Sequence, residues 1–597
     1  MPRPFLLVAV AALAAAPALA APGAPGAIGS GPGVPNGPVS ARAEAAYLRG
    51  RLAEQQSDWR AALDAYRAAV EADPAAPALR VSLAEALART GHLQRADAEA
   101  RRAIELDPSG PAAAEAWLIL GKTAAISRRP AAAEQALRSA VDAQKALAAA
   151  RPPGEAVIDP EPWRLLAQLR LDAGDAADAE AVLTDLGRRS PADGAAGLRD
   201  LGRVVADRKD LDGAAALFRK AVSVDRRDLD AWRRLAELEE SRRRFDAARE
   251  AWEGLVRQDP DDAEGLVALG RLSLRAGESD AARAFFDAAI HAGPEDAGVR
   301  ARVGFAWLDA RRPQEAIAVV DGGLRTRADP RLLYVRGVAL REERRWKEAA
   351  AAFGAVSSGD PDLDLAALAG RAAAMVQYGK GAEALALLAP ALQAHPGEPR
   401  LVAARAHVLE RSGKGKEAVA FLEKELASRP GDERLLFALG VAQDRAGDRA
   451  GAIATMQRLL TASPDNADAM NFVGYSWAER GERLEEAEAL VSRAVELDPD
   501  NGSFLDSLGW IRFQRGDVAG AIALLERAEA LAGPEPTILE HLGDAYRKSL
   551  RDADAARAWR RALQAIDEGA ETDLPGQRAG IEKKLRDLPG DVRPARR

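Results

Sequence analysis

The sequence predicts an all-α fold, an α-solenoid superhelix of about fifteen helix-turn-helix repeats. The first observation is a pattern of small residues, an aromatic residue and a closing proline that recurs about every 34 residues from Gly50 onward. The closing segments include AYRAAVEADP, which ends at Pro74, ARRAIELDP at Pro108 and AWEGLVRQDP at Pro260. The second is a hydrophobic content of 48% with only 5% aromatics, so that alanine dominates and helices can approach closely.

The N-terminus has the pattern of a signal peptide, which we expect to span residues 1–20. Arg3 precedes the apolar run FLLVAVAALAAA, and Ala18-Leu19-Ala20 provides a cleavage site after Ala20. An uncleaved anchor is the alternative, although the run is shorter than the roughly 20 residues of a transmembrane helix. We therefore expect a periplasmic or secreted bacterial protein with no membrane span after cleavage. The signal peptide is followed by a Gly/Pro-rich stretch over residues 21–42, which we expect to be a linker.

Each repeat is expected to consist of two helices with distinct small-residue patterns. In the first helix a large residue precedes a small crossing residue by four positions, as at Gly202 and Gly337. In the second helix an alanine is followed by an aromatic or aliphatic residue four positions later, as in Ala214/Phe218. These spacings place the residues on one helical face. The Asp-Pro pair stops the second helix, and segments such as RAGD (445–448) make the turn between helices.

These patterns divide the chain into a predicted order of segments. N-terminal repeats occupy 43–145, an insertion follows at 146–160, and the main array covers 161–565. Residues 566–597 are predicted to form a capping helix, GQRAGIEKKLRDL, and a basic tail. The segment LREERRWKEA (340–349) is predicted to be a helix with a solvated face and internal ion pairs.

The repeats resemble tetratricopeptide repeats over nearly the whole predicted mature chain. The resemblance implies a right-handed superhelix that binds other proteins in a concave groove. The stretch from NFVGYSWAERGERLEEAEALVSRAVELDP to EHLGDAYRKS is similar to the C-terminal repeats of bacterial envelope tetratricopeptide proteins. Some of those are outer-membrane lipoproteins that deliver a processing protease to cell-wall hydrolases, but this chain has no cysteine to carry a lipid.

Composition argues against several other functions. The net charge of −8 provides no general basic field for nucleic acid, so no nucleic-acid partner is expected. There is no cysteine, and the five histidines are scattered without metal-binding spacing. No phosphate-binding glycine loop and no nucleophile–base arrangement is visible, so we expect no catalytic residues, no metal, no cofactor and no enzymatic activity.

Two sets of side chains are predicted to face the groove. The first is a stripe of arginines in the middle repeats, whose guanidinium groups suit carboxylates of a partner. Local pairing with acids such as Glu237 or Glu239 is the alternative. The stripe consists of Arg164, Arg199, Arg203, Arg233, Arg234, Arg271 and Arg302. The Lys and Asn set of the carboxylate clamp found in chaperone-binding repeats is not present.

The second set lies in the C-terminal repeats and combines polar groups with aromatics. Such a surface favours hydrogen bonding to a peptide backbone. Ordinary packing between first helices is the alternative for Trp510. The set consists of Asn471, Tyr475, Asp506, Ser507, Trp510, Glu540, His541 and Asp544.

The sequence therefore predicts a non-catalytic scaffold or adaptor of the bacterial cell envelope that binds partner proteins or peptides. The partner would be an envelope protease, a hydrolase or an export component. An accessory role in export or assembly of an envelope polysaccharide is the alternative, which the sequence separates poorly from the first.

Overall fold

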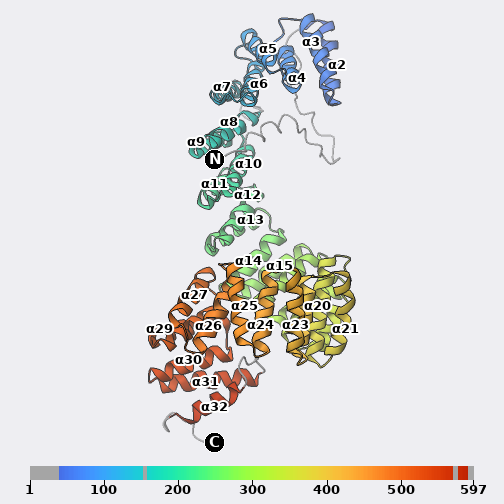
Figure 1. Cartoon of the computed structure of the whole chain (residues 1–597). Coiled ribbons are helices and arrows are strands. Elements are labelled where there is room, and N and C mark those ends of the chain that lie inside the picture. Colours follow the sequence, from blue (N-terminus) through green and yellow to red (C-terminus); the bar gives the residue numbers. More distant parts are fainter. Residues whose placement is uncertain (1–38, 152–157, 569–575, 589–597) are drawn as a thin grey trace. The chain divides into compact units, whose positions relative to one another are not determined.

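The computed structural model of the protein describes residues 39–151, 158–568 and 576–588 (Figure 1). Regular structure in these ranges consists of 31 α-helices, α2 to α32, without a strand. Thirty of them form fifteen consecutive pairs, from α2 and α3 to α30 and α31, and α32 follows alone. The predicted α-solenoid of about fifteen helix pairs is therefore confirmed, whereas the predicted signal peptide lies outside the described residues.

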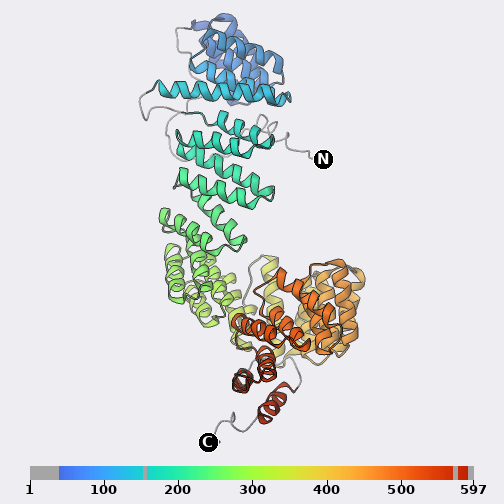
Figure 2. The same cartoon turned by 90° about the vertical axis from the view of Figure 1, so that its left-hand side faces the viewer.

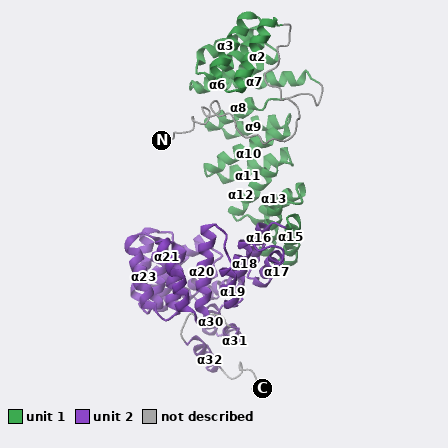
Figure 3. Cartoon of the chain, turned by 90° about the vertical axis from the view of Figure 1, so that its right-hand side faces the viewer, with its two compact units in different colours: residues 1–294 green, residues 295–597 purple. Residues whose placement is uncertain are grey.

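The helices belong to two compact units, residues 1–294 and 295–597 (Figure 3). The first unit contains α2 (Ala41–Gln55), α3 (Trp59–Ala72), α4 (Pro77–Arg89), α5 (Leu93–Leu106), α6 (Pro111–Ile126), α7 (Pro130–Ala149), α8 (Glu161–Asp172), α9 (Ala176–Gly187), α10 (Pro191–Asp207), α11 (Leu211–Val224), α12 (Leu229–Ser241), α13 (Phe245–Gln258), α14 (Ala263–Arg275) and α15 (Ser279–Ala292).

The second unit contains α16 (Ala297–Asp309), α17 (Pro313–Leu324), α18 (Pro330–Glu342), α19 (Trp346–Gly354), α20 (Pro361–Gln377), α21 (Gly381–Ala394), α22 (Pro399–Arg411), α23 (Gly415–Ser428), α24 (Glu433–Arg445), α25 (Arg449–Ala462), α26 (Ala467–Glu479), α27 (Leu484–Leu497), α28 (Gly502–Gln514), α29 (Val518–Ala532), α30 (Pro536–Lys548), α31 (Asp552–Asp567) and α32 (Gln577–Arg586).

Within a pair, a glycine of the first helix packs against a large side chain of the second. A Cβ atom added to Gly202 of α10 would lie 2.7 Å from the Phe218 ring of α11, and one added to Gly337 of α18 would lie 2.7 Å from the Phe353 ring of α19. Both rings are buried. The predicted roles of the small crossing residue and of the second-helix aromatic are therefore confirmed.

The turn between the two helices of a pair uses a residue in the left-handed conformation, and the turn between α26 and α27 uses two, Gly481 and Arg483. Gly447 adopts it with φ +87°, in the predicted RAGD turn, but Arg311 and Arg344 adopt it as well, with φ of 58° and 57°. Arg344 thus separates α18 from α19, so the prediction of one continuous helix over residues 340–349 is wrong. The sequence pattern failed there because an arginine stands where most such turns have glycine.

The region of the predicted insertion follows the longest described helix. α7 has 20 residues and runs to Ala149, as the long cyan helix in Figure 2 shows. Residues 146–149 of the predicted insertion are therefore helical, and α8 begins at Glu161. Residues 152–157 lie outside the described part of the chain.

Candidate functional site

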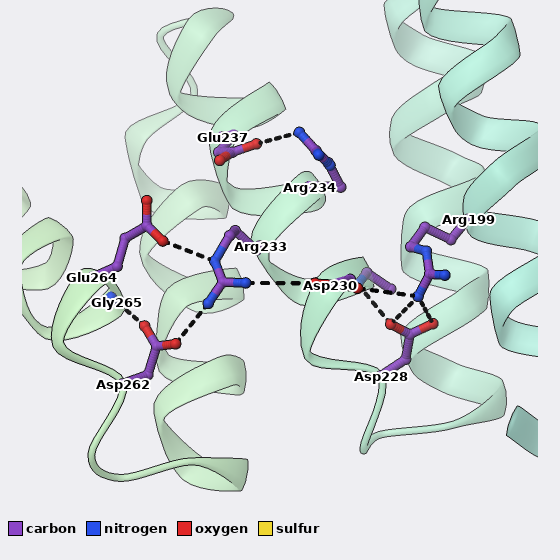
Figure 4. Close-up of polar contacts among 10 residues, drawn as sticks. Arg199, Asp228, Asp230, Arg233, Arg234, Glu237, Asp262, Glu264 and Gly265 are labelled. Carbon is purple, nitrogen blue, oxygen red and sulfur yellow. Dashed lines mark hydrogen bonds and ion pairs between the residues drawn. The ribbon is translucent and has the colours of Figure 1, made fainter. Parts of the chain in front are cut away.

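The arginines predicted to form a stripe lie mostly in ion pairs that join one repeat to the next. Arg199 on α10 contacts both carboxylate oxygens of Asp228, at 2.7 and 2.9 Å, and Arg233 on α12 contacts Asp262 at 2.6 Å (Figure 4). Arg164 on α8 repeats the arrangement with Asp193 of α10 at 3.2 Å. Each arginine precedes its partner by 29 positions.

Two of these aspartates also cap the helix that they precede. Asp228 accepts a hydrogen bond from the Ala231 backbone nitrogen. Asp262 accepts one from the Gly265 backbone nitrogen (Figure 4). An N-cap carboxylate satisfies a backbone N–H that has no partner within the helix. The side chains of the two aspartates are only 8% and 11% exposed. One buried carboxylate thus starts a helix and attaches it to the preceding repeat.

The remaining arginines of the predicted stripe differ in their contacts. Arg234 pairs with Glu237 at 3.2 Å and Arg271 with Glu240 at 2.5 Å. Arg203 and Arg302 are exposed and make no ion pair with any other described residue. Most of the stripe is therefore neutralised by acids of the chain itself, which is the alternative that the sequence left open.

In the C-terminal set, His541 is the centre of a buried cluster. The Nδ1 atom of His541 on α30 lies 2.9 Å from Asp506 of α28, and both side chains are less than a tenth exposed. The Trp510 ring stacks on the imidazole at 4.1 Å between centroids, and Tyr475 of α26 lies 6.2 Å away. Burial lowers the pKa of His541, but the Asp506 carboxylate, together with those of Asp544 and Glu540, outweighs burial and raises that pKa above its ordinary value.

Glu540 and Asp544, predicted to contact a partner, instead contact the last helix of the same chain. Lys584 of α32 lies 2.7 Å from the Glu540 carboxylate and 2.6 Å from that of Asp544. Gln577 donates a further hydrogen bond to Glu540 at 3.0 Å. The reason is that α30 belongs to the final helix pair, and no further repeat follows it among the described residues. α32 therefore covers the face of α30 that, in earlier pairs, the first helix presents to the following repeat.

Two polar atoms of the same set are buried without a partner. The Asn471 Oδ1 and Trp510 Nε1 atoms have no hydrogen bond to any other atom of the described residues. Trp510 stacks on Phe513 as well as on His541, at 5.0 Å between centroids. The Trp510 ring thus packs between neighbouring side chains, as the alternative interpretation of the sequence proposed. The C-terminal set as a whole is more buried than the sequence predicts.

The sequence did not reveal a large groove in the second unit. A hollow of about 1340 Å³ is lined by residues of α18, α19, α20 and α22, together with the turns at Arg311 and Arg344. Five of its lining residues are arginines. The segment LREERRWKEA contributes Arg341, Arg344 and Trp346 to the lining. Its cluster of arginines beside a tryptophan was the feature of the sequence that could have indicated this groove.

The described residues offer neither a metal centre nor a membrane helix. In the described ranges, no group of three or more His, Cys, Asp or Glu residues is arranged to hold a metal ion. Among the helices of the same ranges, none is both long and apolar enough to cross a bilayer.

Comparison with known proteins identifies the family of the chain. The tetratricopeptide repeat family matches residues 47–111, 82–150, 164–231, 233–297, 306–364, 437–502 and 507–571, and a second family of the same description matches 340–408. These matches cover well over half of the chain, which therefore belongs to the tetratricopeptide repeat proteins. The predicted family resemblance is confirmed.

Individual relatives are similar over shorter stretches or at low identity. The TPR repeat-containing protein PA4667 of Pseudomonas aeruginosa is 39% identical over 79 residues, which is 13% of this chain and 13% of that protein. A tetratricopeptide repeat protein from Parabacteroides merdae is 17% identical over 43% of this chain and 97% of its own, with a TM-score of 0.32. The structure of Naa15/Naa10 bound to HypK-THB contains a chain that is 14% identical over 92% of this chain and 100% of its own, with a TM-score of 0.34.

Membership of the family defines the class of function. Tetratricopeptide repeat proteins bind other proteins and are typically scaffolds without catalytic activity. The chain is accordingly a scaffold for protein–protein interaction.

Proposed function

We propose that this scaffold works in the bacterial cell envelope, where it binds partner proteins or peptides and performs no chemistry of its own. The partner is an envelope protease, a hydrolase or an export component. The main support is the combination of a repeat array along nearly the whole described chain with the apolar run and Ala18-Leu19-Ala20 pattern at its N-terminus. Cleavage after Ala20 would release the protein into the periplasm or beyond the cell.

The mode of binding follows from how repeat arrays are built. Each helix pair buries its seam against its neighbours, so the surfaces left for a partner are grooves lined by first helices. In the described residues the open hollow beside Arg341, which the first helices α18, α20 and α22 help to line, is such a surface. A partner would be held by many modest contacts rather than by a closed pocket.

Localisation is tested by N-terminal sequencing of the protein recovered from a fractionated bacterial envelope. We expect the chain to begin at Ala21 and to leave the membrane fraction in high salt. A chain that keeps Met1 and stays with the membrane contradicts the export step.

The partner is tested by crosslinking in intact cells, followed by purification of the tagged chain and mass spectrometry. We expect envelope proteases, hydrolases or export components to be enriched over a bait that lacks residues 1–20 and stays in the cytoplasm. Enrichment of a polysaccharide synthase or its outer-membrane channel would instead favour the polysaccharide role. Turnover by the purified protein in a hydrolase screen, abolished by a single substitution, would contradict a non-catalytic function.

A further inference from the structure

The groove of the second unit has an open floor made of small side chains. Ala369 and Gly370 of α20 and Ala403 of α22 lie on it, and all three are at least partly accessible to solvent. Small side chains on adjacent first helices leave room for another backbone to approach closely. A volume of about 1340 Å³ exceeds the roughly 300–1,000 Å³ of pockets that hold small molecules. The dimensions suit a segment of polypeptide.

The rim of this groove is strongly basic in a chain whose net charge is −8. Its charged side chains are one glutamate, Glu342, and five arginines, which we call the arginine groove: Arg311, Arg341, Arg344, Arg400 and Arg411. All five arginines are exposed. The groove therefore carries an excess of positive charge where the rest of the chain is acidic on average.

Three of the five guanidinium groups make no hydrogen bond or ion pair within the described residues, although the charges of two of them, Arg311 and Arg341, act on the Glu342 carboxylate. Arg400 pairs with Asp362 at 3.0 Å, and Arg411 donates to the Gln377 side chain at 2.9 Å. By contrast, Arg311, Arg341 and Arg344 make no hydrogen bond or ion pair through their side chains to any other described residue. Arg199 and Arg233 differ from these three arginines, because each forms an ion pair with an aspartate of the next repeat.

One side of the arginine groove is aromatic. Tyr334 of α18 and Trp346 of α19 line it, and the Tyr334 ring meets the buried Phe353 ring edge-on at 5.6 Å. Phe305 of α16 is 39% exposed and lies 6.4 Å from Tyr334. Partly exposed aromatics beside arginines are typical of the residues that dominate protein–protein binding.

We propose that the arginine groove binds an acidic peptide segment of a partner protein, with carboxylates paired to Arg311, Arg341 and Arg344 and an apolar side chain against Tyr334 and Trp346. Charge complementarity selects the acidic residues, because a guanidinium group binds a carboxylate through two parallel hydrogen bonds. The small-residue floor, which lets a second polypeptide backbone approach closely, favours a peptide. A single-stranded nucleic acid, whose bases would stack on the aromatic rings, is the competing occupant that the test must separate from it. The proposal rests on the scaffold function above and names the chemistry of one partner.

The test measures binding of short fluorescent peptides to the purified chain beginning at Ala21, by fluorescence anisotropy. The probe alternates glutamate and glycine around one phenylalanine, and its matched control replaces every glutamate by glutamine. We expect saturable binding of the acidic peptide that weakens as salt rises from about 0.05 to about 0.5 M, and none of the glutamine peptide. A peptide with alanine in place of phenylalanine should bind more weakly than the probe.

The site is located with the double variant R341Q/R344Q, which removes two charges and keeps side chains of similar length. We expect about tenfold weaker binding of the acidic peptide, with an unchanged circular dichroism spectrum and melting temperature. The control R434Q/R458Q removes two exposed arginines of α24 and α25 that make no ion pair with any other described residue and do not line the groove, and it should bind as the unaltered chain does.

Several outcomes overturn the proposal. These are equal loss in the two double variants, equal binding of the glutamine peptide, no binding of the acidic peptide, or tighter binding of a short single-stranded oligonucleotide. If crosslinking still enriches envelope proteins when the acidic peptide does not bind, the scaffold function stands and only the arginine groove is excluded. If crosslinking also finds no partner, the scaffold function in the envelope fails as well.

Discussion

Glu115 makes the stability of the first unit depend on pH near neutrality. It lies on α6 in a small cavity of about 280 Å³, shared with Glu85 of α4 and with Asp159, which precedes α8. Burial raises the pKa of Glu115 from its ordinary value of 4.5 to about 7, and the two neighbouring carboxylates add to the effect. Between these pH values the folded chain keeps a proton that the unfolded chain has released.

The sign and size of the effect follow from this difference in proton binding. Because the folded state binds more protons, the free energy of unfolding falls as pH rises from 4.5 to about 7. At about 1.4 kcal/mol per pKa unit, the full loss at this one group is about 3 kcal/mol. Glu115→Gln stays neutral at every pH, so this part of the pH dependence should disappear in the variant.

The measurement is urea denaturation of the unaltered chain and of Glu115→Gln, followed by circular dichroism from about pH 4 to about pH 8. We expect the variant to gain stability relative to the unaltered chain by about 3 kcal/mol across this range. The control is Glu105→Gln, since the Glu105 side chain is 62% exposed and its removal should leave the slope unchanged. Parallel stability curves for the unaltered chain and Glu115→Gln would refute the reasoning.

Three further predictions concern helix crossing, the last helix and the buried histidine. Gly202→Val should push the Phe218 ring out of its site and destabilise its unit by about 2 kcal/mol in urea, whereas Gly431→Ala, with open space around it, should not. Lys584→Ala should leave the Glu540 and Asp544 carboxylates without their cation and cost about 2 kcal/mol in thermal unfolding, a loss that the exposed Lys583→Ala should not reproduce. An NMR titration should give His541 a pKa above its ordinary value of 6.5, and Asp506→Asn should lower it; the stabilisation from this pair is complete below pH 6.5 and is lost as pH rises through the folded-state pKa. If the pKa of His541 were the same in Asp506→Asn as in the unaltered chain, a group other than Asp506 would be responsible for raising it.

The repeat and its internal packing could be predicted from the sequence because they depend on residues close together in the chain. Gly202 and Phe218 belong to one helix pair. The helical period places each on the apolar face of its own helix, and the short turn between α10 and α11 brings these two faces together. The contacts between repeats could not be predicted in this way. Arg199 reaches Asp228 only because the next first helix starts beside it, and this requires the geometry of the stack.

The candidate sites were harder to predict for the same reason. Lys584 and Glu540 are 44 positions apart, and only the placement of α32 brings them together. The arginine groove collects residues from Arg311 to Arg411, over several repeats, and part of it lies in a segment that we predicted to be a solvated helix. The boundary between α18 and α19 could not be seen in the sequence, because Arg344 rather than a glycine adopts the left-handed backbone conformation at that turn.

The aspartates that cap one helix and bind the arginine of the repeat before it have a consequence for the evolution of the array. Arg199 and Arg233 are 34 positions apart, and so are their partners Asp228 and Asp262. Loss of one whole repeat from this region would therefore place Arg199 opposite Asp262, and a tandem duplication would create another matching pair. The joints are interchangeable, so the chain can lengthen or shorten by complete repeats without leaving an orphaned charge at the splice.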